Sequence, residues 1–160
     1  MEAKEIQKLK DLAGNIRIAM LTTLDKDGEM RSRPMATTKI SEEGFAYFFT
    51  QADSPKIHEL ETDSKVNISY QDTDEEIYVS VSGHASIERD QKLINELWSP
   101  YLNAWFPEGK EDPNLTLLKV KITKAEYWDA PGNRMVQLLG MAKSILTKTP
   151  YTAGEHEKLK

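Results

Sequence analysis

The chain has 160 residues, a formal net charge of -5 at pH 7 and no cysteine. Its length suits one domain with its own hydrophobic core, and the lack of cysteine excludes disulfides, thiolate metal sites and a thiol nucleophile. The acidic balance argues against nucleic-acid binding as the main function, because such surfaces are basic. It leaves room for a local pocket that binds one small phosphate.

The N-terminal residues predict a short amphipathic helix over about residues 2–13. Ile6, Leu9 and Leu12 recur at helical spacing, and Gly14 ends the pattern. The chain starts with charged residues, unlike a secretory leader, and it contains no apolar run long enough to cross a bilayer. We therefore expect a cytoplasmic protein with no membrane partner.

After this helix the apolar residues alternate with a period of two, which predicts a β-hairpin. One side of its first strand carries Ile16, Ile18, Met20 and Leu24. The second strand covers residues 30–40 and contains Pro34, which cannot donate a ladder hydrogen bond, so we expect an edge position or a bulge. Arg31 and Arg33 share one face of this strand, where they can be solvated or contact a ligand.

A strongly β-prone run ends in Phe49-Thr50, and a helix is predicted to begin soon after it. Ser54 is a good N-cap and Pro55 suits the first helical position, so the helix should start at Pro55. The first turn offers unpaired N–H groups, and Lys56 adds a full charge. Most capped helix starts hold no anion, so a purely structural role stays open for the helix alone. Together with Arg33, these residues indicate a phosphate site.

Two further strands follow, one beginning near Val66 and one over residues 77–88, with a bulge or sharp bend at Gly83. An acidic cluster between them is interpreted as a solvated loop rather than a metal site, because it shows no ligand spacing: Asp72, Asp74, Glu75 and Glu76. Asp90 caps a predicted helix over residues 91–98. The aromatic residues that follow in 101–110 can pack a core edge, line a cofactor pocket or form a dimer contact.

The last predicted strand covers residues 115–128 and ends in an aromatic pair. A C-terminal helix over about residues 133–147 follows, and residues 151–160 form a polar tail that we expect to be mobile or loosely docked. Antiparallel strands joined by short turns, with one helix between them, predict a closed or nearly closed barrel, since closure removes the sheet edges. We expect a single domain over residues 1–150.

No familiar catalytic constellation is present. His58, His84 and His156 fall in a predicted helix, a strand and the tail, without metal-ligand spacing. The sequence has no nucleophile elbow, no phosphate-binding P-loop and no Gly-x-Gly-x-x-Gly motif. Any chemistry would therefore have to come from a cofactor.

The order Arg33-x-Met35, Phe49-Thr50 and Ser54-x-Lys56 resembles the flavin-binding pattern of the pyridoxamine 5'-phosphate oxidase-like split-barrel proteins, in particular the general stress protein 26-like branch. The likeness runs from the first strand to Trp128 and includes the closing residues 154–158. It implies a mainly β fold with flanking helices, namely a dimeric, antiparallel, Greek-key-like split β-barrel that binds FMN.

The resemblance also implies the residues of the FMN site. The Arg-led segment would lie along the flavin, the hydroxyls and the lysine would hold its phosphate, and the tryptophan would approach from the partner subunit of a homodimer. No metal is implied. The residues so assigned are Arg33, Pro34, Met35, Ala36, Thr37, Thr38, Phe49, Thr50, Ser54, Lys56 and Trp128.

The sequence departs from the true pyridoxamine phosphate oxidases at their substrate site. Pro55 stands where they have the arginine of an Arg-Lys pair, Tyr78 replaces their glutamine, and their C-terminal Arg-x-His segment is missing, with Arg134 nearby. We therefore expect FMN binding without vitamin B6 synthesis. Two functions stay open, a flavin-dependent oxidoreductase and a non-catalytic flavin-binding stress protein that acts as a carrier or sensor. A deazaflavin or haem-derived ligand is a further alternative.

Overall fold

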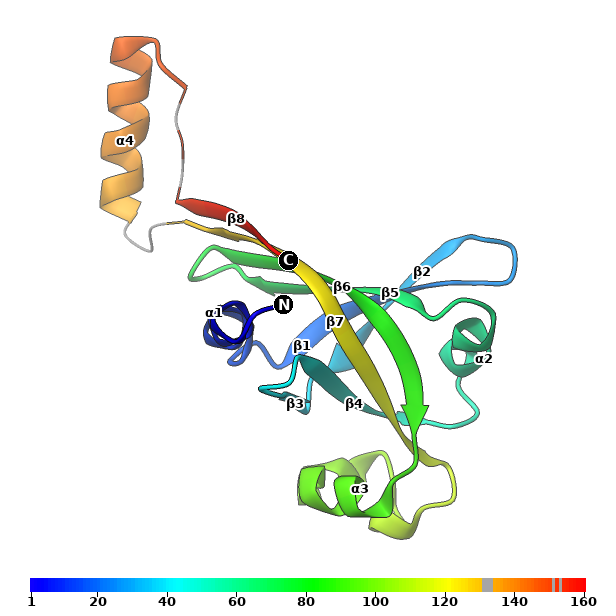
Figure 1. Ribbon diagram of the computed structural model, residues 1–160. Helices are drawn as coiled ribbons and strands as arrows, with labels where there is room; N and C mark the ends of the chain where they lie inside the picture. Colours follow the sequence, from blue (N-terminus) through cyan, green and yellow to red (C-terminus); the bar gives the residue numbers. More distant parts are fainter. Residues whose placement is uncertain (131–133, 151, 153) are drawn as a thin grey trace.

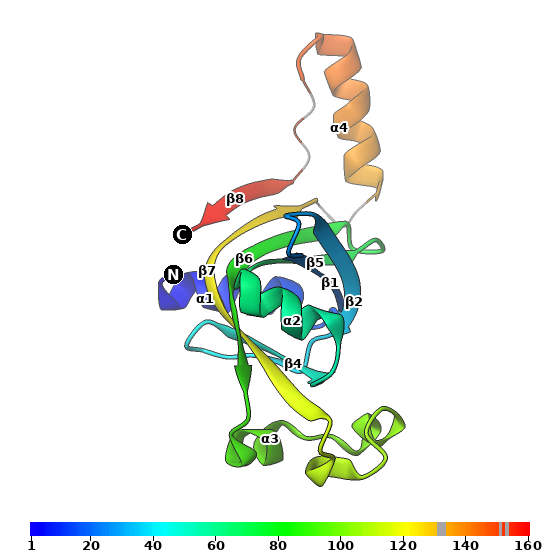
Figure 2. The same ribbon diagram turned by 90° about the vertical axis from the view of Figure 1, so that its right-hand side faces the viewer.

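The computed structural model describes residues 1–130, 134–150, 152 and 154–160. An antiparallel sheet dominates this part of the chain, with the strand order β2-β1-β5-β6-β7-β4-β3, and β8 pairs with β7. Figure 1 and Figure 2 show that it curls into a half-barrel, which confirms the predicted mainly β split-barrel fold. The strands are β1 (Ile18–Leu24), β2 (Met30–Ala36), β3 (Lys39–Ile40), β4 (Phe45–Gln51), β5 (Lys65–Asp72), β6 (Ile77–Glu88), β7 (Leu115–Asp129) and β8 (Glu155–Leu159).

The helices flank the sheet. Helices α1 and α2 lie at opposite ends of the half-barrel, and Figure 2 looks along it with α2 in front. Helix α3 lies below the far ends of β6 and β7, while α4 projects away from the barrel (Figure 1). Their bounds, with two short 3-10 helices, are α1 (Ala3–Ala13), α2 (Pro55–Thr62), α3 (Gln91–Leu97), η1 (Pro100–Ala104), η2 (Gly109–Glu111) and α4 (Arg134–Thr147).

The core lies inside the half-barrel, where alternate side chains of each strand meet. Leu9 of α1 and Leu60 of α2 close its two ends. Full burial of a large apolar side chain contributes about 1.5–3 kcal/mol, so these residues supply much of the driving force for folding. The strand residues that are almost fully buried include Leu21, Phe48, Ile68, Val81 and Val120.

Several local predictions are confirmed. Helix α2 begins at Pro55, and the Asp90 side chain accepts a hydrogen bond from the Lys92 N–H at 2.8 Å, which caps α3. Strand β2 lies at the edge of the sheet, as Pro34 requires. In the described part of the chain, no helix has both the length and the apolar character that crossing a bilayer needs.

The predicted strand over residues 30–40 is interrupted. The Thr37 N–H donates to the Arg17 carbonyl, and the Thr38 N–H donates to the Tyr47 carbonyl, both at 2.9 Å. The chain thus passes from the ladder with β1 to the ladder with β4. Because residues 30–36 pair with β1 and residues 39–40 pair with β4, the chain has to bend between them. The predicted single strand is therefore divided into β2 and β3.

Residues 151–160 were predicted to form a mobile or loosely docked tail, but Glu155–Leu159 form β8, which pairs with β7. Strand β4 pairs with one edge of β7 only as far as Lys121, and β8 covers the same edge from Ala125 onward. Leu159 is buried in the core. This polar segment is therefore held in place by hydrogen bonding to the free edge of β7 and by burial of Leu159. Asn133 and Tyr151, which the sequence places at the start of the last helix and of the tail, lie outside the described residues.

The bulge predicted at Gly83 is present, because the pairing of β6 with β7 shifts register between Ser82 and Gly83. An added Cβ would lie 2.5 Å from the Lys121 carbonyl oxygen and 2.8 Å from Cγ1 of Val120. We expect Gly83→Ala to lower the free energy of unfolding by about 1–3 kcal/mol, because neither backbone nor packed core can yield easily. Urea unfolding measures this. Ser86→Ala, an exposed change on the same strand, is the control, and equal midpoints would contradict the close packing.

Candidate functional site

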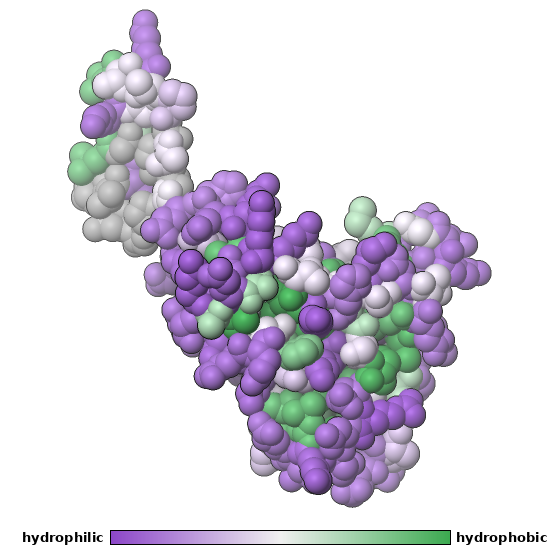
Figure 3. Space-filling view, viewed as in Figure 1, coloured by the Kyte–Doolittle hydropathy of each residue, from purple (hydrophilic) through white to green (hydrophobic). Residues whose placement is uncertain are grey.

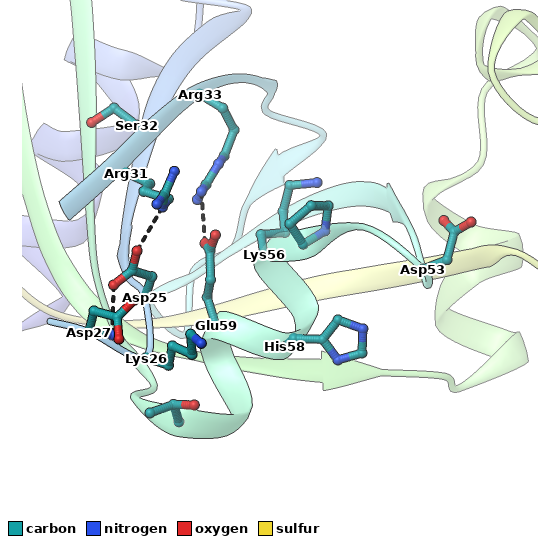
Figure 4. Close-up of a pocket in the computed structure, with 12 residues that line it drawn as sticks. Asp25, Lys26, Asp27, Arg31, Ser32, Arg33, Asp53, Lys56, His58 and Glu59 are labelled. Carbon is teal, nitrogen blue, oxygen red and sulfur yellow. Dashed lines mark hydrogen bonds and ion pairs between the residues drawn. The ribbon is translucent and has the colours of Figure 1, made fainter. Parts of the chain in front are cut away.

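The predicted site residues gather around two grooves beside β2. The polar groove, about 1040 Å³ in volume, lies between the β1–β2 hairpin and α2, and Arg31, Arg33, Lys56 and Glu59 line it (Figure 4). The aromatic groove, about 570 Å³, is lined by residues 34–38, by the end of β4 and by aromatic side chains that follow α3. The segment that the sequence assigns to the flavin therefore lines both grooves, with Arg33 in the polar groove and residues 34–38 in the aromatic groove.

The start of α2 positions the lysine between the grooves. Ser54 has extended backbone angles and Pro55 begins the helix, but the Ser54 hydroxyl makes no capping hydrogen bond. It lies 3.5 Å from the Thr50 hydroxyl instead. The first-turn N–H groups thus have no side-chain acceptor at the cap position, which leaves this helix end suited to an external anion.

Lys56 joins the two grooves. Its Nζ donates to Oγ1 of Thr50 at 2.8 Å, which ties a residue of the polar groove to one of the aromatic groove. Burial, and secondly the nearby Arg33 guanidinium, lower the pKa of Lys56 below its usual value. Within the described residues no carboxylate lies at ion-pair distance from this ammonium group. An anion bound here would supply the missing countercharge.

Arg33 already has a protein partner. Its Nη2 contacts Oε2 of Glu59 at 2.7 Å, and its Nη1 donates to the Thr23 hydroxyl. Thr23 in turn donates to Glu59 at 2.5 Å. Glu59 and Thr23 are both buried, and Figure 4 shows Glu59 reaching from α2 toward Arg33. The guanidinium has five donors, so this network leaves others free for a ligand.

The charges of the polar groove nearly balance. The Arg33–Glu59 pair is neutral, and Arg31 forms a second pair with Asp25 at 2.8 Å. That contact lowers the pKa of Asp25 and raises the pKa of Arg31. Lys26 and Lys56 are matched in formal charge by Asp27 and Asp53, but within the described residues the Lys56 ammonium itself has no carboxylate at ion-pair distance.

The aromatic groove has buried and exposed walls. Phe49 and Phe106 are buried, and Trp98 packs edge-on to Phe49 with ring centroids 5.8 Å apart. Tyr101 and Trp105 remain exposed on the rim. Behind the groove, the Thr37 hydroxyl donates to the phenol oxygen of Tyr70 at 3.2 Å, and burial raises the pKa of Tyr70 to about 12. A flat apolar ligand fits this composition.

The structure thus brings together all but one of the predicted site residues. Arg33 and Lys56 line the polar groove, and Ser54 contacts Thr50. The residues that line the aromatic groove are Pro34, Met35, Ala36, Thr37, Thr38, Phe49 and Thr50. Trp128 lies elsewhere in the same chain, in a hollow with Met20 and Tyr78, and its ring stacks on His156 with centroids 5.0 Å apart.

Sequence reasoning missed Glu59 and Thr23. Glu59 lies three residues after Lys56, about one helical turn on, so both face the same groove. This spacing could have identified Glu59 from the sequence, because a carboxylate on the same side of the helix as Lys56 needs a nearby cation as its partner. Thr23 carries no local signal, because only the folded hairpin places it against Arg33.

Comparisons with known proteins agree with this architecture. The family model described as "Pyridoxamine 5'-phosphate oxidase like" matches residues 4–152. Protein bli-3 of Neurospora crassa is 32% identical over 162 residues, which cover 93% of this chain and 78% of that protein. General stress protein 26 of Bacillus subtilis is 32% identical over 118 residues, which cover 72% of this chain and 81% of that protein.

A solved structure extends the comparison to three dimensions. The crystal structure of the general stress FMN/FAD binding protein from Xanthomonas citri is 31% identical, with a TM-score of 0.66, and covers 78% of this chain and 87% of that chain. These findings confirm the family that the sequence motifs indicated.

Proposed function

The chain belongs to the pyridoxamine 5'-phosphate oxidase-like family, and on this basis we propose that it is an FMN-binding protein of the general stress type that acts as a flavin-dependent oxidoreductase. The observation that carries the proposal is Lys56, a partly buried ammonium group without a carboxylate partner in the described structure, at the join of a polar and an aromatic groove. FMN has the matching parts, a phosphate and a flat ring.

The residues of both grooves fit this cofactor. Lys56, Arg33, Thr50 and Ser54 would hold the phosphate, because they combine charge with hydroxyl donors. Residues 34–38 would hold the ring. Since the N–H groups of residues 37 and 38 already donate inside the protein, contacts from that end of the segment fall to side chains and carbonyl groups.

Bound FMN would supply electron transfer, as a hydride or as single electrons. The protein's own contribution is to bind the cofactor, to orient it and to exclude water from the aromatic groove. The residues lining that groove include no carboxylate and no imidazole. This observation favours the second candidate, a non-catalytic carrier or sensor, because no strong acid or base is at hand. Anaerobic reduction by NADH or NADPH, followed by turnover, separates the two candidates.

The flavin assignment is tested by absorbance of the purified protein before and after FMN addition, with free ligand removed by gel filtration. We expect structured flavin bands at about one FMN per chain, since the two grooves offer one joined site. A protein that retains no FMN would refute the assignment. The same experiment with a deazaflavin or a haem-derived ligand then identifies the alternative.

We also infer a homodimer, from the outer face of the sheet. Register places Gln71, Tyr78 and Trp128 in one row across β5, β6 and β7, next to Ile18 and Met20 of β1. The four large apolar side chains here are between 41% and 56% exposed. Contiguous apolar surface of this kind marks an interface. A second copy seated here could bring its Trp128 toward the flavin of the first.

The projecting helix α4 supports the same partner. It lies in the sequence between β7, whose end carries Trp128, and β8. Figure 3 shows apolar side chains of α4 open to solvent. The described ones with the greatest exposure are Leu138, Leu139, Met141, Ile145 and Leu146. A monomer would leave all of this surface in water.

Met20→Lys is expected to convert the dimer to a monomer, because it buries an unpaired charge in the interface. Size-exclusion chromatography with light scattering gives the mass, and FMN retention should fall with it. Met30→Lys is the matched control, since Met30 is exposed but lies outside the Trp128 hollow. A wild-type protein that runs as a monomer, or equal behaviour of both variants, would contradict the dimer.

A further inference from the structure

The lining of the aromatic groove includes a cation that the FMN assignment does not use. Arg17 precedes β1, and its guanidinium lies 5.2 Å from the centroid of the Tyr101 ring. The rings of Tyr101 and Trp105 follow each other along the rim, with centroids 5.4 Å apart and planes tilted by 57°. All three side chains line the aromatic groove, whereas Lys56 lines the polar groove.

The charge of Arg17 is not balanced by the protein. Within the described residues it has a ring contact but no carboxylate at ion-pair distance, whereas Arg31 pairs with Asp25 and Lys39 pairs with Glu96. The Arg17 carbonyl accepts the Thr37 N–H, which fixes its backbone beside the groove. A guanidinium that lines a groove without a carboxylate partner among the described residues can bind an anion despite the chain's net charge of -5.

The two exposed rings are not needed for packing. Phe106 and Trp98 already anchor this segment to the second hydrophobic cluster, and Phe106 is 3% exposed. Tyr101 and Trp105 are 62% and 55% exposed. Of the three roles open for this aromatic stretch, Phe106 takes core packing, while Tyr101 and Trp105 take the groove wall. Exposed aromatic faces beside a cation suit a flat ligand with a negative group.

We propose that Arg17, Tyr101 and Trp105 form a binding subsite for a planar aromatic carboxylate. The guanidinium pairs with the carboxylate in a bidentate manner, and the two rings contact the aromatic body. A cationic ligand is disfavoured, because the groove offers no carboxylate to receive it. The inference rests on the proposed function in one respect, since it places the subsite in the same aromatic groove whose residues 34–38 would hold the FMN ring.

The test uses 2-naphthoate as the probe and 2-naphthamide as its neutral counterpart, each titrated by calorimetry into the full-length protein with and without FMN. We expect naphthoate to bind about tenfold more tightly than naphthamide, because only the carboxylate can form a charge-assisted contact. Arg17→Met should remove this preference. Arg89→Met is the matched control, since Arg89 is exposed and lies outside the aromatic groove.

Trp105→Leu should weaken the binding of both probes, because it removes an aromatic wall of the groove and leaves the Arg17 charge unchanged. Circular dichroism confirms that each variant is folded. Equal affinity of the wild type for naphthoate and naphthamide would overturn the subsite, as would a loss of FMN retention in Arg17→Met with naphthoate affinity unchanged. Naphthoate binding by a protein that retains no FMN would uphold the subsite and refute the flavin assignment, so the two failures are distinguishable.

Discussion

Lys56→Ala is expected to weaken FMN binding by about 10- to 150-fold, because a charge-assisted contact to phosphate is worth about 1.5–3 kcal/mol. The variant should fold as well as the wild type. In the unliganded protein the Lys56 ammonium is partly desolvated and lies near another cation, which is why its pKa is lowered. Its removal therefore relieves the repulsion with Arg33 and costs the hydrogen bond to Thr50 and a weaker attraction to Glu59. Quenching of FMN fluorescence on titration gives the dissociation constant.

Two controls isolate the phosphate contact. Lys26→Ala removes an exposed lysine that lines the same groove from the β1–β2 hairpin, and it should change FMN affinity little. Riboflavin, which lacks the phosphate, should bind equally to wild type and Lys56→Ala. Unchanged FMN affinity in Lys56→Ala would remove this lysine from the site, and an equal loss for riboflavin would assign it to the ring.

Local features of the site could be read from the sequence. Ser54-Pro55 fixes the start of α2 because cap preference and the fixed φ of proline act within a few residues. Gly83 marks the bulge for a similar reason, since only glycine fits against the Lys121 carbonyl. The strand pattern predicted a closed or nearly closed barrel, and the split barrel followed from the family resemblance carried by Arg33-x-Met35, Phe49-Thr50 and Ser54-x-Lys56.

Other features depend on contacts between distant residues. Residues 37 and 38 carry no turn signal, yet the strand breaks there because its two halves pair with different neighbours. Strand β8 consists mostly of charged residues, which have low β-propensity, and only the free edge of β7 makes it a strand. Pairing between Arg33 and Glu59 likewise arises only when α2 packs beside β2. Such features follow from the completed fold.

The Arg33–Glu59 contact leads to the second large prediction. Arg33→Met is expected to lower the free energy of unfolding by about 2–4 kcal/mol, since breaking a buried ion pair costs about 3–5 kcal/mol and the side chain of Arg33 is still 21% exposed. The cost arises mainly at Glu59, whose carboxylate is 9% exposed and would keep only the Thr23 hydroxyl as a partner. Urea unfolding, with an unchanged m-value as the check on two-state behaviour, measures the loss.

The double variant Arg33→Met/Glu59→Leu separates the pair from the orphaned charge. It should recover much of the loss, because an apolar pair leaves no unpaired carboxylate, while FMN binding stays weakened through the missing guanidinium. Arg31→Met on the same strand is the control. The Arg31 side chain is 57% exposed, and Asp25, although only 10% exposed, would keep hydrogen bonds from the N–H groups of Asp27 and Glu29, so the loss should be much smaller. Equal losses of unfolding free energy for Arg31→Met and Arg33→Met would show that the burial of Glu59 does not require its ion pair with Arg33. Apolar packing would then have to stabilise the contact between α2 and β2.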